Sequence, residues 1–308
     1  MSKFNSLRKL LPGAKKTADA DTWYSALLFL SPTLIIFSIF IVFPVFFSFF
    51  LSFQKWNMFS TDKTYVGLDN YIRMFSDPEF WLVMKNTLIY TICTVPLNMI
   101  ISLAIAVALN KILFGKKLLR TAFFTPVIIS PVAAAVIWRW MYDPNFGLLN
   151  YGLSFFGIDS INWLNDTNTA MIAIIIMGVW KTFGINMVLF SAGLQGIPET
   201  YYEAAKIDGA NRWTRFWKIS IPLLAPTTFF ILIMSMIGSF QVFDIVYVLT
   251  SGGPLGSTKV LVFYLYENAF KYFDMGYASA VAYVLFALLI TLSLLQVRFA
   301  RKRVYGVL

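Results

Sequence analysis

The sequence predicts an all-α membrane protein with six transmembrane helices. Of its 308 residues, 58% are hydrophobic and only 13% are charged, whereas about a quarter of the residues in a soluble domain carry a charge. Six long stretches are free, or nearly free, of charged residues, and basic residues collect in the segments between alternate stretches. This pattern argues against a soluble globular enzyme, and also against a disordered chain, which would be far less hydrophobic.

Each expected span follows from one of these stretches, because a helix needs roughly 20 apolar residues to cross a hydrocarbon core about 30 Å thick. The first stretch, Thr22 to Gln54, is longer than one straight span requires and lacks the cleavage pattern of a signal peptide. The fourth is interrupted only by Lys181. The spans are expected near residues 23–53, 86–110, 121–140, 169–195, 222–248 and 275–298, in a transmembrane domain of residues 23–298 flanked by tails of residues 1–22 and 299–308.

Prolines interrupt several of these spans. Pro32 and Pro44 lie in the first, Pro96 in the second, and Pro126 and Pro131 in the third. Inside lipid, a proline frees a carbonyl that neighbouring groups must satisfy. One interpretation is that the prolines simply kink the helices. The other is that broken helices line a moving or solvated path.

The basic residues predict the orientation in the membrane. Seventeen of the 25 Lys and Arg residues, but only five of the 15 Asp and Glu residues, lie in the two tails and in the loops after the second and fourth spans. The positive-inside rule therefore places both termini in the cytoplasm. Topology and anionic membrane lipid then explain the net charge of +10. No basic and aromatic stretch resembles a nucleic-acid-binding module, so no nucleic acid partner is expected.

The chemistry that the sequence lacks is equally informative. His is absent and Cys93 is the single cysteine, so His-based metal sites, catalytic His pairs and an internal disulfide are excluded within the chain. No GxxxxGK[ST] run is present to hold a nucleotide phosphate. We therefore expect no catalytic residue, no metal and no cofactor on this chain. Within the spans, the sparse polar groups suit contact with a solute better than acid–base catalysis: Asn98, Lys181, Asn186, Ser235, Ser239 and Gln241, with Asp244 at the end of span five.

A loop at residues 197–222 predicts a helix-turn-helix. Pro198 suits a first helical position, and Gly209 permits the left-handed backbone that ends a helix. A second amphipathic stretch follows. Its apolar side carries Trp213, Phe216, Trp217 and Ile219. From the pattern alone, a helix pair lying on the lipid headgroups is an equally good interpretation.

This loop resembles the EAA loop of ABC importer permeases, the membrane subunits of binding-protein-dependent transporters. The sequence has Glu203-Ala204-Ala205, then Gly209, then Ile219-Ser220-Ile221-Pro222, with Ile221 where the family usually has Leu. The segments VGLDNY (66–71) and TSGGPLGST (250–258) also resemble the carbohydrate-uptake branch, which includes the maltose and glycerol-3-phosphate permeases. The resemblance covers nearly all of the chain from span one onward.

The resemblance implies the fold of a type I ABC importer permease in a prokaryotic plasma membrane. The chain would form half of the path for a sugar or sugar-like solute that an extracytoplasmic binding protein delivers. It would assemble with a second, different permease chain and with two ATPase subunits, which would hold the ATP and Mg. Docking onto the ATPase would use the EAA loop: Glu203, Ala204, Ala205, Asp208, Gly209, Ile219 and Pro222.

Lys181 is the one charge well inside a span, where a lysine costs about 2.5–3.5 kcal/mol unless it is paired or faces water. One hypothesis is that it pairs or snorkels; the other is that it contacts the solute. By helical spacing and by position in maltose-type relatives, the residues expected along the solute path are Gly178, Lys181, Thr182, Ile185, Gly238, Ser239 and Gln241.

Two alternatives to an importer subunit remain at this point. A stand-alone secondary carrier or channel would have no use for an ATPase-docking loop and more often carries carboxylates within its spans. A membrane-embedded enzyme is disfavoured by the missing catalytic groups. Outside the membrane, residues 259–273 predict a further helix, expected in the outer interface, in which Glu267 and Lys271 are spaced i, i+4.

Overall fold

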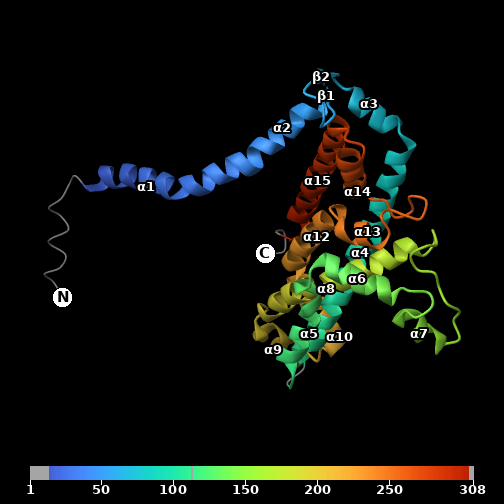
Figure 1. Cartoon of the computed structure of the whole chain (residues 1–308). Coiled ribbons are helices and arrows are strands. Elements are labelled where there is room, and N and C mark those ends of the chain that lie inside the picture. The colour runs from blue at the N-terminus through green and yellow to red at the C-terminus, as the bar shows by residue number, and fades with distance from the viewer. Residues whose placement is uncertain (1–13, 112–113, 305–308) are drawn as a thin grey trace.

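The computed structural model describes residues 14–111 and 114–304, and these are almost entirely helical (Figure 1). The first span is α1 (Ala14–Phe37), a π-helical turn η2 (Ser38–Val42) and α2 (Phe43–Ser52). The remaining spans are α4 (Pro78–Lys111), the pair α5 (Lys116–Ile128) and α6 (Pro131–Met141), α8 (Ala170–Gln195), α12 (Ala225–Phe240) and α15 (Met275–Val304).

Short elements join the spans at the two ends of the molecule. One end carries the strands β1 (Gln54–Lys55) and β2 (Thr64–Tyr65), which pair antiparallel, with α3 (Asp69–Ser76). Further connecting helices are α7 (Leu148–Ser154), α13 (Asp244–Leu249), α14 (Leu261–Tyr266) and the π-helical η4 (Glu267–Lys271). The opposite end carries α9 (Glu199–Ile207), α10 (Arg212–Arg215), η3 (Phe216–Ser220) and α11 (Ile221–Leu223).

Four helices are long and apolar enough to cross a membrane, and two bent pairs bring the total to six in the described chain. One pair is α5 and α6, whose axes differ by 99°; the other is the segment 212–223 and α12, which differ by 63°. The stretch expected as one span near residues 121–140 is therefore two helices at nearly a right angle. The helix is broken before Pro131 and not simply kinked, whereas Pro126 lies inside α5; a moving or solvated path along these helices stays a prediction.

Two other boundaries differ from the expected ones. Helix α4 begins at Pro78, well before residue 86, because the Asp77 carboxylate accepts a hydrogen bond from the Glu79 N–H (2.8 Å) and Pro78 suits the first turn. The span expected near 222–248 is divided, since α12 ends at Phe240 and α13 begins only at Asp244.

Helix α8 lies at the centre of the bundle, where it packs against α4, α5, α6, α12 and α13. Sixteen of its 26 residues are buried. Gly184 lets α5 approach closely, because a Cβ atom at this position would lie 2.5 Å from the Phe123 carbonyl oxygen. The first span behaves differently. It projects from the body as a long arm (Figure 1), and α2 near its base packs on α15, where the Phe49 and Tyr283 rings lie 5.0 Å apart.

The predicted helix at residues 259–273 forms as α14 and η4, and its predicted place in an outer interface stays a prediction. Leu261, Phe263 and Tyr264 are all buried, against α4 and α15. The i, i+4 pair is present, with 3.1 Å between Lys271 Nζ and Glu267 Oε1.

Lys259 links η4 to α4 through two ion pairs. Its ammonium lies 2.7 Å from Glu267 Oε2 and 2.6 Å from Glu79 Oε1, and Glu267 is only 4% exposed. Burial by itself lowers the pKa of Lys259, but the hydrogen bonds and negative charges of Glu267 and Glu79 outweigh burial and raise its pKa above the ordinary value. The ammonium is therefore charged, and it neutralises a buried carboxylate.

We predict that Lys259→Met lowers the free energy of unfolding by about 3 kcal/mol, because it removes the buried partner of Glu267. Lys271→Met is the matched control: its side chain is 63% exposed, so its pair with Glu267 contributes less than about 1 kcal/mol. Denaturant unfolding of the detergent-solubilised chain measures both. Equal losses in the two variants would contradict this assignment.

Candidate coupling loop and solute path

Helix α9 carries the Glu-Ala-Ala run on the molecular surface. Glu199 lies in its first turn, where a negative charge is favourable. The helix ends at Gly209, whose φ of +75° is the left-handed conformation that glycine adopts without strain. The Ala210 N–H then donates to the Ala205 carbonyl (2.8 Å), a bond that closes the C-terminal turn.

The second helical segment is fixed to the first. The Asn211 side chain caps α10 by accepting a hydrogen bond from the Thr214 N–H at 2.8 Å. Tyr202 Oη and Ser220 Oγ lie 2.9 Å apart and join α9 to η3. The helix-turn-helix expected from the sequence is therefore formed, and it is held by specific contacts of its own.

The loop presents its turn to the outside. No residue of α9 is buried, and Glu203, Ala204, Asp208 and Gly209 are exposed. Ala205 and Ile219 are half-buried, whereas Pro222 is exposed in α11. Ile207, which the sequence analysis did not single out, is 87% exposed. The sequence could have pointed to this residue, because it is an apolar residue directly before the Asp208-Gly209 turn. An exposed apolar side chain beside a charged one is suited to a protein contact.

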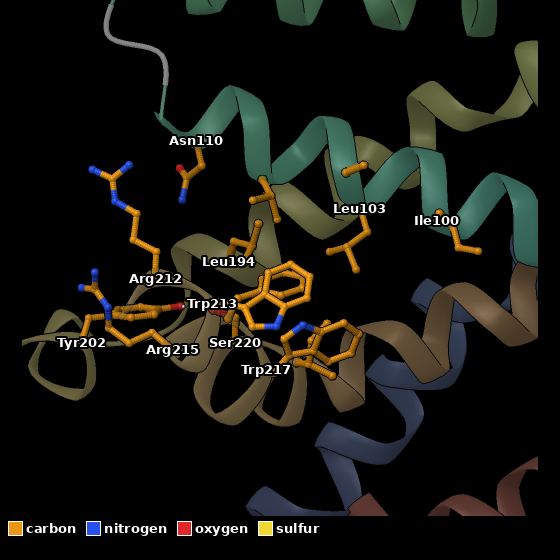
Figure 2. A pocket seen from close by; sticks show the side chains of 14 residues that line it. Ile100, Leu103, Asn110, Leu194, Tyr202, Arg212, Trp213, Arg215, Trp217 and Ser220 are labelled. Atoms are coloured by element: carbon orange, nitrogen blue, oxygen red, sulfur yellow. Dashed lines mark hydrogen bonds between the residues drawn. The ribbon is translucent and has the colours of Figure 1, made fainter. Parts of the chain in front are cut away.

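A groove lies between the second helical segment and α4 (Figure 2). Its volume is about 1050 Å³, and it is lined by both apolar and basic side chains. Tyr202 and Ser220, which join the two segments of the loop, are part of its lining. The loop thus borders a large open space between itself and α4.

The comparison with known proteins decides the family. The sequence model of the family described as "Binding-protein-dependent transport system inner membrane component" matches residues 86–305. The chain belongs to this family. It is an ABC importer permease, a multi-pass protein of the inner membrane, and family membership supports this function over a stand-alone carrier or channel.

Individual relatives are also ABC transporter permeases. The permease is 43% identical over 275 residues to the probable ABC transporter permease protein YesP of Bacillus subtilis, covering 87% of this chain and 88% of that one. It is 37% identical to the trehalose/maltose transport system permease protein MalF of Thermococcus litoralis, covering 90% and 93%. The crystal structure of a bacterial alginate ABC transporter in complex with an alginate pentasaccharide-bound periplasmic protein has the same fold, with a TM-score of 0.82 at 23% identity over 93% of this chain and 97% of that one.

The residues expected along the solute path differ in their exposure. Gly178 is buried against Tyr90, whose hydroxyl oxygen leaves no room for a Cβ atom at this position. Ser239 is also buried and donates its hydroxyl to Thr91 Oγ1 at 3.1 Å. Four of the expected residues are exposed: Thr182, Ile185, Gly238 and Gln241. These four are accessible to a solute or a partner, and their contact with solute stays a prediction.

Lys181 binds the break between α5 and α6. Its ammonium donates to the carbonyls of Pro126 (2.6 Å), Val127 (3.1 Å) and Ile129 (2.6 Å). These carbonyls lie at the end of α5, where a helix leaves its last carbonyls without donors and concentrates negative partial charge. Pro131 aggravates the shortage because it has no N–H to offer Val127.

The structure shows an arrangement that neither hypothesis for Lys181 described. The lysine is only 9% exposed, its ammonium donates to three backbone oxygens, and it forms no ion pair with a carboxylate of the described residues. These hydrogen bonds offset the cost of burying the ammonium group, and they also satisfy the carbonyls that the break in the helix leaves without donors. A solute contact by Lys181 stays a prediction, and it would have to replace one of these bonds.

The other polar groups in the spans contact one another. Asn98 Oδ1 accepts from Asn186 Nδ2 (2.7 Å), and Asn186 also donates to Ser235 Oγ (2.9 Å). Asn98 in turn donates to Thr182 Oγ1 at 2.7 Å. Asn98 and Asn186 are 2% and 5% exposed, so this network ties α4, α8 and α12 together. Of these residues, only Thr182 is exposed.

We predict that Lys181→Met releases the bend between α5 and α6 and lowers the free energy of unfolding by about 3 kcal/mol, because buried carbonyls lose their donors. Spin labels at Leu118→Cys and Val136→Cys, two exposed positions on α5 and α6, measure the bend in a Cys93→Ser background. One narrow distance distribution is expected with Lys181, and a broad, longer one with Met. Lys181→Arg, which keeps the donors, should retain the narrow distribution. An unchanged distribution in Lys181→Met would show that another interaction holds the bend.

Proposed function

We propose that this permease forms half of the path by which an ATP-driven importer carries a sugar or sugar-like solute across the inner membrane. The coupling loop is the observation that carries the proposal. It displays Glu203 to Gly209 on a surface helix that buries none of its own residues. A helix of this kind contributes little to the stability of its own bundle, so its place is best explained by a partner.

The partner at the loop is proposed to be an ATPase subunit. Glu203 is exposed and negative, and it would accept a charge-assisted hydrogen bond from that subunit. The neighbouring Ile207 would supply apolar contact area. ATP and Mg²⁺ would be bound by two such ATPase subunits, and this chain would remain a non-catalytic subunit of the assembly.

ATP binding would act by shifting the permease between two states. The physical requirement is that the ATPase pair binds one state of the loop more tightly than the other. The segment 212–223 runs from the loop directly into α12 through a 63° bend, so movement of the loop would be passed on to a transmembrane helix. The positive-inside charge pattern supports a cytoplasmic position for this loop and for both termini.

The solute class is proposed from the relatives. One similar permease is named for trehalose and maltose, and another, from Agrobacterium fabrum and 35% identical, for sn-glycerol-3-phosphate. The exposed Thr182 and Gln241 offer hydrogen-bonding groups of the kind that hydroxyl-rich solutes need. A second permease chain would complete the path, and an extracytoplasmic binding protein would deliver the solute.

The proposal is tested by Gly209→Asp. A Cβ atom at this position meets nothing within 4 Å, but the φ of +75° strains any residue other than glycine. Asp is one of the residues that adopt this conformation most readily, so the variant should still fold and insert, yet its side chain and charge would obstruct docking. We predict loss of ATP-driven uptake and weaker association with the ATPase, measured in reconstituted vesicles and by co-purification.

Gly67→Asp is the matched control, because Gly67 also has a positive φ (+58°) and open space but lies in the loop before α3. It should leave uptake and association near the level of the unchanged protein. Normal uptake by Gly209→Asp would refute docking at this turn.

A further inference from the structure

The groove between α4 and the second segment of the loop has the composition of a lipid site. We call it the tryptophan groove; Trp213 and Trp217 lie in it side by side (Figure 2), with their rings 5.6 Å apart in an edge-to-face contact. Its volume of about 1050 Å³ is at the upper end of the range of roughly 300–1,000 Å³ for organic ligands. It is large enough for part of a long, flexible molecule.

One end of the groove is apolar. Ile100, Leu103 and Val107 line it from α4, at the three- and four-residue spacing that places them on one face of the helix. Leu194 of α8 adds to this surface. Ile100 is 65% exposed, so the wall is accessible along the helix. Such a surface fits a hydrocarbon chain.

The other end is basic. Arg212 and Arg215 lie three residues apart on the loop segment and are drawn toward the end of the groove near Asn110 (Figure 2). Arg215 Nε is buried, and within residues 14–111 and 114–304 it has no hydrogen-bond partner. Neither arginine forms an ion pair with a carboxylate of the described chain. The two guanidinium groups form no ion pair within the described residues, and the Nε of one of them is a buried donor without a partner there; this combination suits an anion with several oxygen acceptors.

The tryptophans occupy the boundary between the two ends. Trp213 is 70% exposed and Trp217 is 51% exposed. Indole rings favour the level of the headgroups, where an apolar ring and a polar N–H are both accommodated. The sequence of groups along the groove, basic, then aromatic, then aliphatic, matches the sequence of phosphate, glycerol backbone and acyl chain in a phospholipid.

We propose that the tryptophan groove binds an anionic phospholipid, with its phosphate at Arg212 and Arg215 and an acyl chain along α4. Basic pockets between helices on the cytoplasmic side of a membrane are suited to anionic headgroups. The site adjoins the Tyr202–Ser220 contact, so the lipid would brace the loop segment against α4. Only the choice of leaflet rests on the proposed function.

Tryptophan quenching by brominated phospholipid tests the proposal. The full chain is reconstituted in vesicles of phosphatidylcholine that contain increasing brominated phosphatidylglycerol, and in vesicles where the phosphatidylcholine carries the bromine instead. The signal of the groove is the difference between the unchanged chain and Trp213→Phe/Trp217→Phe. We expect this signal to saturate at a low fraction of brominated phosphatidylglycerol. Both leaflets contain the anionic lipid, so the result does not depend on orientation or transport.

Single variants then assign the headgroup contact. Arg212→Gln and Arg215→Gln should each raise the half-saturating fraction about fivefold, the change expected for roughly 1 kcal/mol per basic residue. Lys218→Gln is the control, because it removes one charge from the same segment at a residue outside the groove lining. It should leave the half-saturating fraction unchanged.

Three results would overturn the proposal. The first is equal quenching by brominated phosphatidylcholine, which would mean that the groove does not select an anionic headgroup. The second is a loss of the selective quenching by brominated phosphatidylglycerol when inorganic phosphate is added. This result would mean that a free anion is the ligand. The third is quenching that disappears when the chain is assembled with its transporter partners, which would mean that a protein fills the groove.

Discussion

The bend between α5 and α6 depends on one ammonium group. A bilayer offers no water to a broken helix, so each freed carbonyl must find a donor inside the protein. Lys181 supplies donors to Pro126, Val127 and Ile129 from the central helix α8, while Gly184 lets α5 come within reach. With the bend fixed in this way, α6 turns across the bundle and packs against α13 and α8. A single buried ammonium group thus supplies donors at the break of a whole span.

Polar side chains in the interior of the permease form hydrogen bonds with one another, whereas the charged side chains of the surface helix α9 are exposed. In the interior, Asn98, Asn186 and Ser235 satisfy one another and hold three helices in register. At the surface, the proposed coupling loop exposes Glu203. Because the interior network is closed, a solute that passes the chain would meet its exposed residues, such as Gln241, more readily than the buried amides. The buried polar network and the exposed loop thus lie in different parts of the bundle.

Local patterns were sufficient to predict part of this structure. The spans followed from charge-free stretches, and the loop followed from Pro198 and Gly209, because each signal lies within one segment. The earlier start of α4 could also have been found, since Asp77-Pro78-Glu79 is a helix-start signal. The partners of Lys181 could not, because they lie 52 to 55 residues away in the sequence. For the same reason, the separation of 88 positions between Asn98 and Asn186 hid the fact that these polar groups satisfy each other.

The surface position of α9 has a mechanical consequence. A helix with no buried residue can be pushed as a unit without any loss of core packing, so little of the applied work is absorbed by deformation. Two connections hold α9 to the rest of the chain: the Tyr202–Ser220 hydrogen bond and the short segment that runs into α12. The loop would therefore move as one unit. Because the segment 212–223 meets α12 at an angle of 63°, a displacement of the loop along the membrane surface would tilt this transmembrane helix.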